Sequence, residues 1–138
     1  MTITPDMPTP EMSSKISVKR IYAAKEPDDH KRVLVDRLWP RGIKKDADVI
    51  DEWLPEVAPS AELRKWYNHD PERFEEFRDR YQTELTANPQ QQAAVRHLLD
   101  LAEHGTLTLV YAARDEVHNQ AVILRDYLLH ERSTLDGR

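Results

Sequence analysis

The sequence of 138 residues contains no cysteine and only three glycines. Without cysteine the chain has no thiol nucleophile, no disulfide and no cysteine-based zinc site. Gly42 and Gly105 are far apart and Gly137 lies at the C-terminal end, so neither a P-loop nor the glycine fingerprint of a dinucleotide-binding domain can be placed in the chain. These absences exclude the common redox scaffolds and the phosphate sites that depend on a glycine-rich loop.

Long apolar runs are also absent. No stretch approaches the roughly 20 apolar residues that a membrane helix needs, and the N-terminus lacks the charged and then apolar plan of a signal peptide. Charged residues make up 33% of the chain, and its mean hydropathy is -0.75. We therefore expect a cytoplasmic protein with a heavily charged surface and no membrane partner.

Charge is distributed unevenly along the chain. Residues 15–45 hold ten basic and four acidic side chains, a net charge of +6, whereas residues 46–86 hold five basic and twelve acidic side chains, a net charge of -7. Such segregation indicates either an anion-binding face or two segments that neutralise each other in the folded protein.

The length is that of one domain. Residues 1–14 contain three prolines and little that can be buried, which predicts a disordered N-terminal tail. We expect a single domain over residues 15–132 and a flexible C-terminal end over residues 133–138.

Three segments have the pattern of strands. Apolar and polar residues alternate from Ile16 to residue 22, and a β-branched run covers residues 32–38. Pro40 ends this second strand, because proline has no N–H to donate to a sheet. Residues 106–112 form a nearly continuous apolar run, which is typical of a central strand covered on both faces.

Helices are predicted by caps and by apolar spacing. Ser60 is a candidate N-cap for a short helix through residue 66, and Asp70-Pro71 and Asn88-Pro89 each place a cap before a first-turn proline. Positions 49, 50, 53 and 54 also have helical spacing, but two prolines interrupt that region. Asp115 is expected to cap a last helix, whose apolar face is formed by Val117, Ala121, Leu124 and Leu128. The elements predict an α/β domain with a small, mostly parallel sheet flanked by helices, Rossmann-like in its general layout.

Unusual residues follow two of the predicted strands. Ligands of open α/β sheets bind beyond the carboxyl ends of the strands, and residues 36–42 and 111–119 lie at two such ends. Arg37 and Arg41 have planar guanidinium groups suited to a carboxylate or a phosphate. We take Trp39, between them, as a further candidate ligand-binding residue.

The second loop adds an arginine, Arg114, and the expected start of the last helix. Amides of the first turn of that helix would face the same crevice, with His118 and Asn119 among them. If the protein is an enzyme, His118 is the candidate acid or base, and Tyr111 or Asp36 would orient the reacting group. Asn119 is a candidate ligand-binding residue. The residues leave open whether the protein is an enzyme.

Simpler interpretations compete with this site. Arg37 and Arg41 can pair with the acidic residues of segment 46–56, and Trp39 can belong to the core or to a lid. Asp115 and His118 lie three residues apart, a spacing that suits a metal ion, but no established metal motif is present, and we expect no metal and no cofactor. The pI of about 5.7 and the lack of a recognition module argue against nucleic acid as a partner. The oligomeric state is not defined by the sequence.

The two loops also resemble a known family. The run from Arg32 to Gly42, the residues Leu63-Arg64-Lys65-Trp66 with His69-Asp70-Pro71, and Tyr111-Ala112-Ala113 with His118-Asn119 are similar to the YeaO-type branch of a bacterial family of unknown function. The resemblance covers about residues 15–129. It implies a single α/β domain and no established activity. Longer relatives have a Cys-His-Arg triplet where this chain has residues 117–119, so the resemblance implies a shared site at His118 without shared chemistry.

Two functions follow from these residues. The first is the binding, with or without processing, of a small anionic ligand that carries phosphate, held by Arg37, Arg41 and the turn from Arg114 to Asn119. The second is a non-enzymatic interaction or regulatory module, whose arginine loop binds an acidic partner through an open surface.

Overall fold

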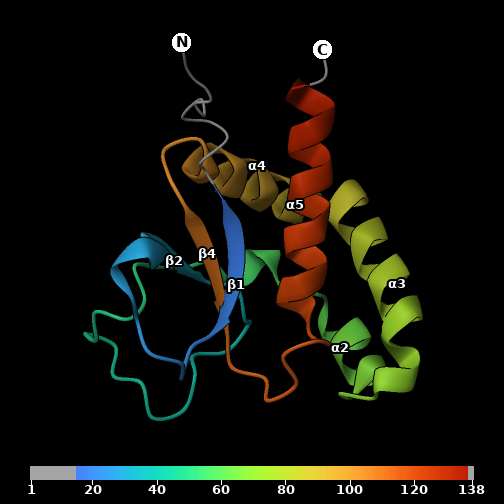
Figure 1. The fold of residues 1–138 in the computed structure, drawn as a ribbon. Helices are drawn as coiled ribbons and strands as arrows, with labels where there is room; N and C mark the ends of the chain where they lie inside the picture. The colour runs from blue at the N-terminus through green and yellow to red at the C-terminus, as the bar shows by residue number, and fades with distance from the viewer. Residues whose placement is uncertain (1–14, 137–138) are drawn as a thin grey trace.

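A computed structural model describes residues 15–136 as one α/β domain with a four-stranded parallel sheet (Figure 1). The strands lie in the order β1-β4-β2-β3, with pairs joined in parallel. Their bounds are Ile16–Arg20 for β1, Lys31–Leu34 for β2, Glu52–Trp53 for β3 and Leu107–Tyr111 for β4. The prediction of a small parallel sheet in an α/β domain is confirmed. The predicted N-terminal tail, residues 1–14, lies outside the described residues.

The described helices begin at or just after capping side chains. They are α2 at Ala61–Tyr67, α3 at Phe74–Ala87, α4 at Pro89–Ala102 and α5 at Gln120–Asp136. The Ser60 hydroxyl accepts a hydrogen bond from the N–H of Leu63, and the Asn88 side chain accepts from two N–H groups at the start of α4. Asp70 caps a short 3-10 turn, Pro71–Arg73, that leads into α3. No helix of the described residues is long and apolar enough to span a membrane.

The helices and a loop cover opposite faces of the sheet. The larger apolar cluster joins all four helices to strand residues such as Val33, Leu109 and Tyr111. The smaller cluster has Ile21, Leu34 and Val110 at its centre and contains no helical residue. Its partly buried members come mainly from one long segment: Trp39, Ile43, Val49, Ile50 and Trp53, together with Ala112. We call residues 36–51 the covering loop, because they close this second face.

The covering loop explains two differences from the predicted elements. Strand β2 ends at Leu34 rather than at residue 38, because the Asp36 side chain, in place of a backbone carbonyl, accepts the hydrogen bond from the N–H of Ala112 in the neighbouring chain segment. The helical spacing at positions 49, 50, 53 and 54 does not produce a helix. Val49 and Ile50 pack on the second face, and Glu52–Trp53 forms the short edge strand.

The last helix begins later than its sequence pattern predicts. Asp115 does not cap it: α5 starts at Gln120, and the Asn119 side chain accepts a hydrogen bond from the N–H of Val122. Val117 lies before the helix and is 62% exposed, whereas Ala121, Leu124 and Leu128 are fully buried. The helix continues to Asp136, past residue 132.

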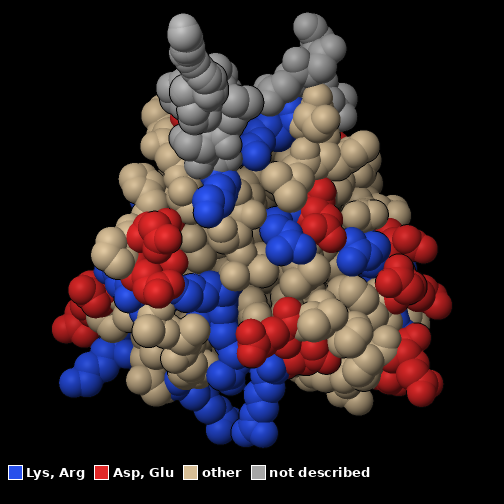
Figure 2. All heavy atoms as spheres, viewed as in Figure 1, with Lys and Arg blue, Asp and Glu red and all other residues tan. Residues whose placement is uncertain are grey.

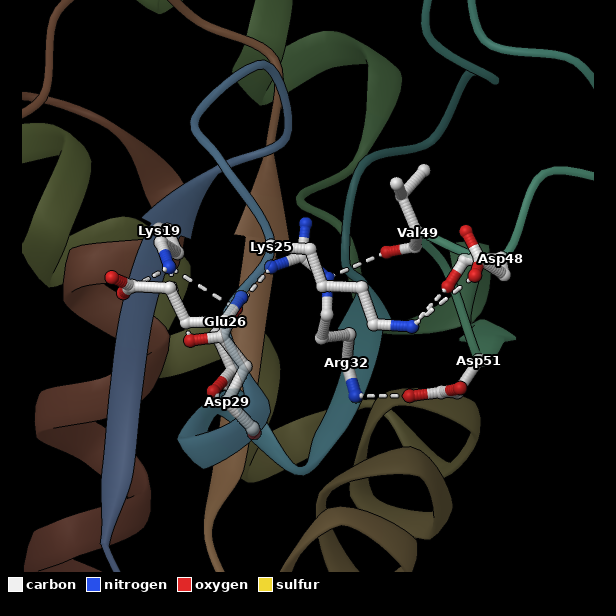
Figure 3. Close-up of polar contacts among 9 residues, drawn as sticks. Lys19, Lys25, Glu26, Asp29, Arg32, Asp48, Val49 and Asp51 are labelled. Atoms are coloured by element: carbon white, nitrogen blue, oxygen red, sulfur yellow. Dashed lines mark hydrogen bonds and ion pairs between the residues drawn. The ribbon is translucent and has the colours of Figure 1, made fainter.

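A buried arginine joins the covering loop to the sheet (Figure 3). The side chain of Arg32 in β2 is fully buried, and its Nη1 lies 2.5 Å from the Asp29 carboxylate. Its Nε donates to the carbonyl of Val49, and its backbone N–H donates to the carboxylate of Asp51. The Asp29 carboxylate also forms an ion pair with Lys19, whose Nζ lies 3.1 Å from Oδ1. Arg32 therefore holds both the connection after β1 and the end of the covering loop.

Removal of Asp29 should destabilise the whole domain. In Asp29→Ala the Arg32 guanidinium would stay buried without its carboxylate, so we expect the free energy of unfolding to fall by about 3–5 kcal/mol in urea denaturation. Glu26→Ala is the matched control. Glu26 is exposed, and its one ion pair among the described residues is with Lys19 at the rim of the same cluster, so we expect a loss below about 1 kcal/mol. Equal losses in the two variants would contradict this role of Asp29.

The contribution of Asp29 should also depend on pH in one direction. Burial raises the pKa of Asp29, but the N–H of Glu26 and the cations of Lys19 and Arg32 lower it more, and the net result is a pKa below 3.8. Because the folded pKa is the lower one, the stabilisation is complete above about pH 5 and is lost as the pH falls through the folded pKa. The difference in unfolding free energy between the wild type and Asp29→Ala should therefore shrink at acidic pH.

Candidate functional site

The ends of three parallel strands meet at one edge of the sheet. Segments after β1, β2 and β4 are joined there by hydrogen bonds. Asp36 accepts from the N–H of Ala112 at 2.9 Å and also from the side chain of Gln120. Arg20, the last residue of β1, donates from Nε to the carbonyl of Ala113 at 3.0 Å. The two predicted loops therefore share one surface.

Asp36 is placed inside this edge rather than toward solvent. Burial raises the pKa of Asp36, against the hydrogen bonds from Ala112 and Gln120 and the electrostatic interactions with Arg64 and His69. Its carboxylate oxygens are both engaged with donors of the chain. Asp36 thus holds the loop after β2 against the loop after β4.

Three arginines of the edge extend into solvent. Arg37, Arg41 and Arg114 are exposed, and none of them belongs to an ion pair among the described residues. Figure 2 shows Lys and Arg side chains projecting at the end of the molecule where the strands end. We call Arg20, Arg37, Arg41 and Arg114 the basic edge.

The acidic segment does not neutralise the arginines of the basic edge. Three of its carboxylates have other partners: Asp48 lies 3.9 Å from Lys25, Glu52 contacts Lys31 and His97, and Asp51 accepts from the backbone N–H of Arg32. The pairing of Arg37 and Arg41 with residues 46–56, which the sequence left as an alternative, is therefore not present in the structure.

Two tryptophans support the loop that carries these arginines. The indole N–H of Trp39 donates to the carbonyl of Ile43 at 2.6 Å, and that of Trp53 donates to the carbonyl of Asp36 at 2.9 Å. The rings meet edge to face, with centroids 5.5 Å apart. The ammonium of Lys45 lies 4.9 Å and 5.2 Å from the two ring centroids. The indole N–H of Trp39, a candidate ligand-binding residue, is therefore already bonded within the loop.

The loop is also fixed from the side of β1. The Tyr22 hydroxyl donates to the carbonyl of Arg41 at 2.7 Å, and the Arg20 guanidinium lies 5.0 Å from the Tyr22 ring centroid. Gly42 follows with a φ of 78°, a conformation that glycine adopts at little cost, and nothing lies near its Cα where a side chain would project. Arg41 is therefore displayed on a backbone held from both sides.

The turn before α5 satisfies its own amides. Oδ1 of Asp115 accepts from the N–H groups of Val117 and His118, both at 2.9 Å. These are among the amides that the sequence assigned to an external anion, and they are not free to bind one. His118 and Asn119 precede the helix instead of forming its first turn.

His118 is held by three neighbours. Its Nδ1 lies 2.9 Å from Asp115, its carbonyl accepts from the Tyr67 hydroxyl at 2.7 Å, and its ring stands edge to face against Phe74 with centroids 5.1 Å apart. Burial raises the pKa of Tyr67 to about 12, so this hydroxyl keeps its proton at neutral pH. About a third of the His118 side chain, 36%, remains exposed.

Two other candidates lie in the interior. Asn119 is 2% exposed, and its amide is used at both ends, donating to the carbonyl of Asp115 and accepting from Val122. Tyr111 is also 2% exposed, and burial raises the pKa of its hydroxyl. Both side chains therefore support the basic edge from the interior of the domain.

Several residues of this edge were not among the sequence candidates. The rule that selected Arg37, a position at the carboxyl end of a parallel strand, also applies to Arg20, which ends β1. Tyr67 and Gln120 have no local signal, because each acts on a residue more than 50 positions away in the sequence.

Two hollows of the described surface and its one acidic cluster lie away from the basic edge. Two shallow hollows of the described surface, about 510 and 270 Å³ in volume, lie on or beside α2 and α3 and include no residue of the basic edge. Within the described chain, Glu26, Asp28 and Asp29 form the one group with the spacing of metal ligands. Lys19 and Arg32 already neutralise Glu26 and Asp29 there.

The fold and the edge define a small parallel α/β domain with an open basic surface. The chain belongs to the family described as "Inactive DUF488-N3 subclade", which matches residues 15–137. No solved structure matches the chain.

Relatives with high identity cover nearly the whole domain. The chain is 42% identical over 113 residues to "Uncharacterized protein YeaO" of Escherichia coli K12, covering 82% of this chain and 96% of that protein. It is 44% identical over 115 residues to "Uncharacterized protein Rv3073c" of Mycobacterium tuberculosis H37Rv, covering 83% of this chain and 94% of that protein. The predicted resemblance to YeaO-type proteins is confirmed.

The Asp115 turn gives a test of this geometry. The N–H groups of His118 and Val117, and then the His118 ring, lower the pKa of Asp115 to about 2. We expect a carbon-detected NMR titration of the Asp115 carboxyl to reproduce this value. In His118→Phe the two backbone N–H donors remain, so the pKa should rise but stay below 3.8. A return to 3.8 would show that the ring, and not the turn, dominates.

Proposed function

We propose that this chain is a non-catalytic binding protein that docks an acidic partner on its basic edge. The observation that carries this proposal is the exposure of Arg37, Arg41 and Arg114 without ion pairs among the described residues, on two strand-end segments that hydrogen bonds tie to each other and to the end of β1. Unpaired surface cations attract an acidic partner over several ångströms and orient it.

Three observations support an open docking surface over an enclosed catalytic site. The edge coincides with neither of the two hollows described above, and the amides near His118 are engaged by Asp115. Asp36 is bonded on both oxygens within the chain. The description of the family as an inactive subclade also agrees with binding in the absence of catalysis.

The proposal predicts salt-sensitive binding that depends on the covering loop. A fluorescent peptide of alternating Glu and Ser serves as the acidic probe, measured by anisotropy at low and at high salt. Exposed ion pairs contribute about 0.2–1 kcal/mol each, so Arg37→Ala with Arg41→Ala should weaken binding by roughly twofold to thirtyfold at low salt. High salt should weaken the wild-type binding in the same way.

Arg96→Ala is the matched control for charge. Arg96 is exposed on α4, away from the strand ends, and its removal changes the net charge by one unit as each loop substitution does. The affinity of the Arg96→Ala variant for the peptide should equal that of the wild type. If the wild type does not bind the peptide at low salt, the acidic partner is wrong. If a thermal-shift assay finds a nucleotide or sugar phosphate that stabilises the protein regardless of salt and requires Arg41, a small phosphate ligand replaces the acidic partner.

A further inference from the structure

Exposed apolar side chains accompany the arginines of the basic edge. Among the described residues four large hydrophobic side chains are exposed: Tyr22 at 45%, Leu38 at 72%, Val117 at 62% and Leu129 at 38%. The first three lie on the segments that directly follow β1, β2 and β4. A single exposed leucine is ordinary on any protein surface, but these three share one edge.

Each of the three segments combines one apolar side chain with arginine. Tyr22 stands beside Arg20, Leu38 lies between Arg37 and Arg41 in the chain, and Val117 follows Arg114. Arginine and aromatic residues are enriched at protein–protein contact surfaces, whose fully buried centre is more apolar than the rest of the surface, and a few well-packed residues there provide most of the affinity. A free phosphate or a bare polyanion would leave Leu38 and Val117 unused.

The surface is also fixed before any partner arrives. The Trp53 indole holds the carbonyl of Asp36, and the Tyr22 hydroxyl holds that of Arg41, so the backbone on either side of Leu38 is fastened. Val117 stands in the Asp115 turn, where its own N–H is bonded. A backbone that is ordered in the free protein loses little conformational entropy on binding.

We propose that the partner of the basic edge is a protein segment that contains both acidic and large apolar side chains, with Leu38 and Val117 as its apolar anchors. This inference rests on the proposed function, because the arginines of the edge attract the acidic groups of the same segment. The charges set the rate and orientation of association, and the apolar contacts set how long the complex persists.

Two peptides of equal charge separate the inference from the proposed function. The first is the alternating Glu and Ser peptide, and the second has Leu in place of three of its Ser residues. The wild type should bind the Leu-containing peptide about tenfold more tightly, and this advantage should persist at high salt, where the Glu and Ser peptide is released.

Variants of the two anchors assign the advantage to this edge. Leu38→Ser with Val117→Ser should reduce it to less than twofold and leave the affinity for the Glu and Ser peptide unchanged, because all four arginines remain. Both side chains are mostly exposed, so the fold should tolerate the substitutions, which circular dichroism checks. Leu129→Ser, the control on α5, should behave as the wild type.

The possible failures are distinct. If neither peptide binds at low salt, the proposed function itself fails. If both bind with equal affinity, or if the advantage survives in Leu38→Ser with Val117→Ser, the acidic partner stands and the apolar anchors are wrong. A single-stranded oligonucleotide of equal charge that binds more tightly than the Leu-containing peptide would also overturn the assignment to a protein partner.

Discussion

A parallel sheet has two apolar faces to remove from water, and the described helices of this chain reach only one of them. The second face is covered by irregular backbone, which must satisfy its own polar groups without the hydrogen bonds of a helix. The buried guanidinium of Arg32 solves much of this problem. It bonds Asp29 on one side and the carbonyl of Val49 on the other, so that the covering loop has a fixed end. Trp53 fixes the start of the loop at Asp36, and Trp39 fixes its middle at Ile43.

This arrangement joins stability to recognition. The apolar side of the covering loop packs on Leu34 and Val110, while its outer side displays Arg37 and Arg41. A surface loop that only displayed charges could move freely, whereas this one cannot leave the sheet without exposing the smaller core. The same segment therefore gives the basic edge a defined shape and places a constraint on how its sequence can vary.

The sequence predicted best what depends on local contacts. Asp70-Pro71 and Asn88-Pro89 start their helices through caps only a few residues long, and the apolar run at residues 106–112 became the central strand. The predicted end of β2 was wrong, and the helical spacing near residue 50 produced no helix, because those segments depend on contacts between residues distant in the sequence. Strand β2 ends where the Asp36 side chain accepts a hydrogen bond from Ala112, 76 positions away. Val49 and Ile50 are apolar because they pack on the second face of the sheet, not because they form one side of a helix. At the candidate site, the solvent-facing arginines followed from strand ends, but the burial of Tyr111 and Asn119 and the engagement of Asp115 with its own amides required the tertiary structure.

The placement of the tryptophans makes the protein its own optical probe. Trp39 lies in the covering loop and Trp53 in the adjoining strand β3, with the Lys45 ammonium near both rings, whereas Trp66 lies on α2 near the guanidinium groups of Arg73 and Arg80. Indole emission responds to nearby charge and to water. A displacement of Lys45 or of the loop would therefore change the light from two of the three tryptophans, without any label attached to the chain.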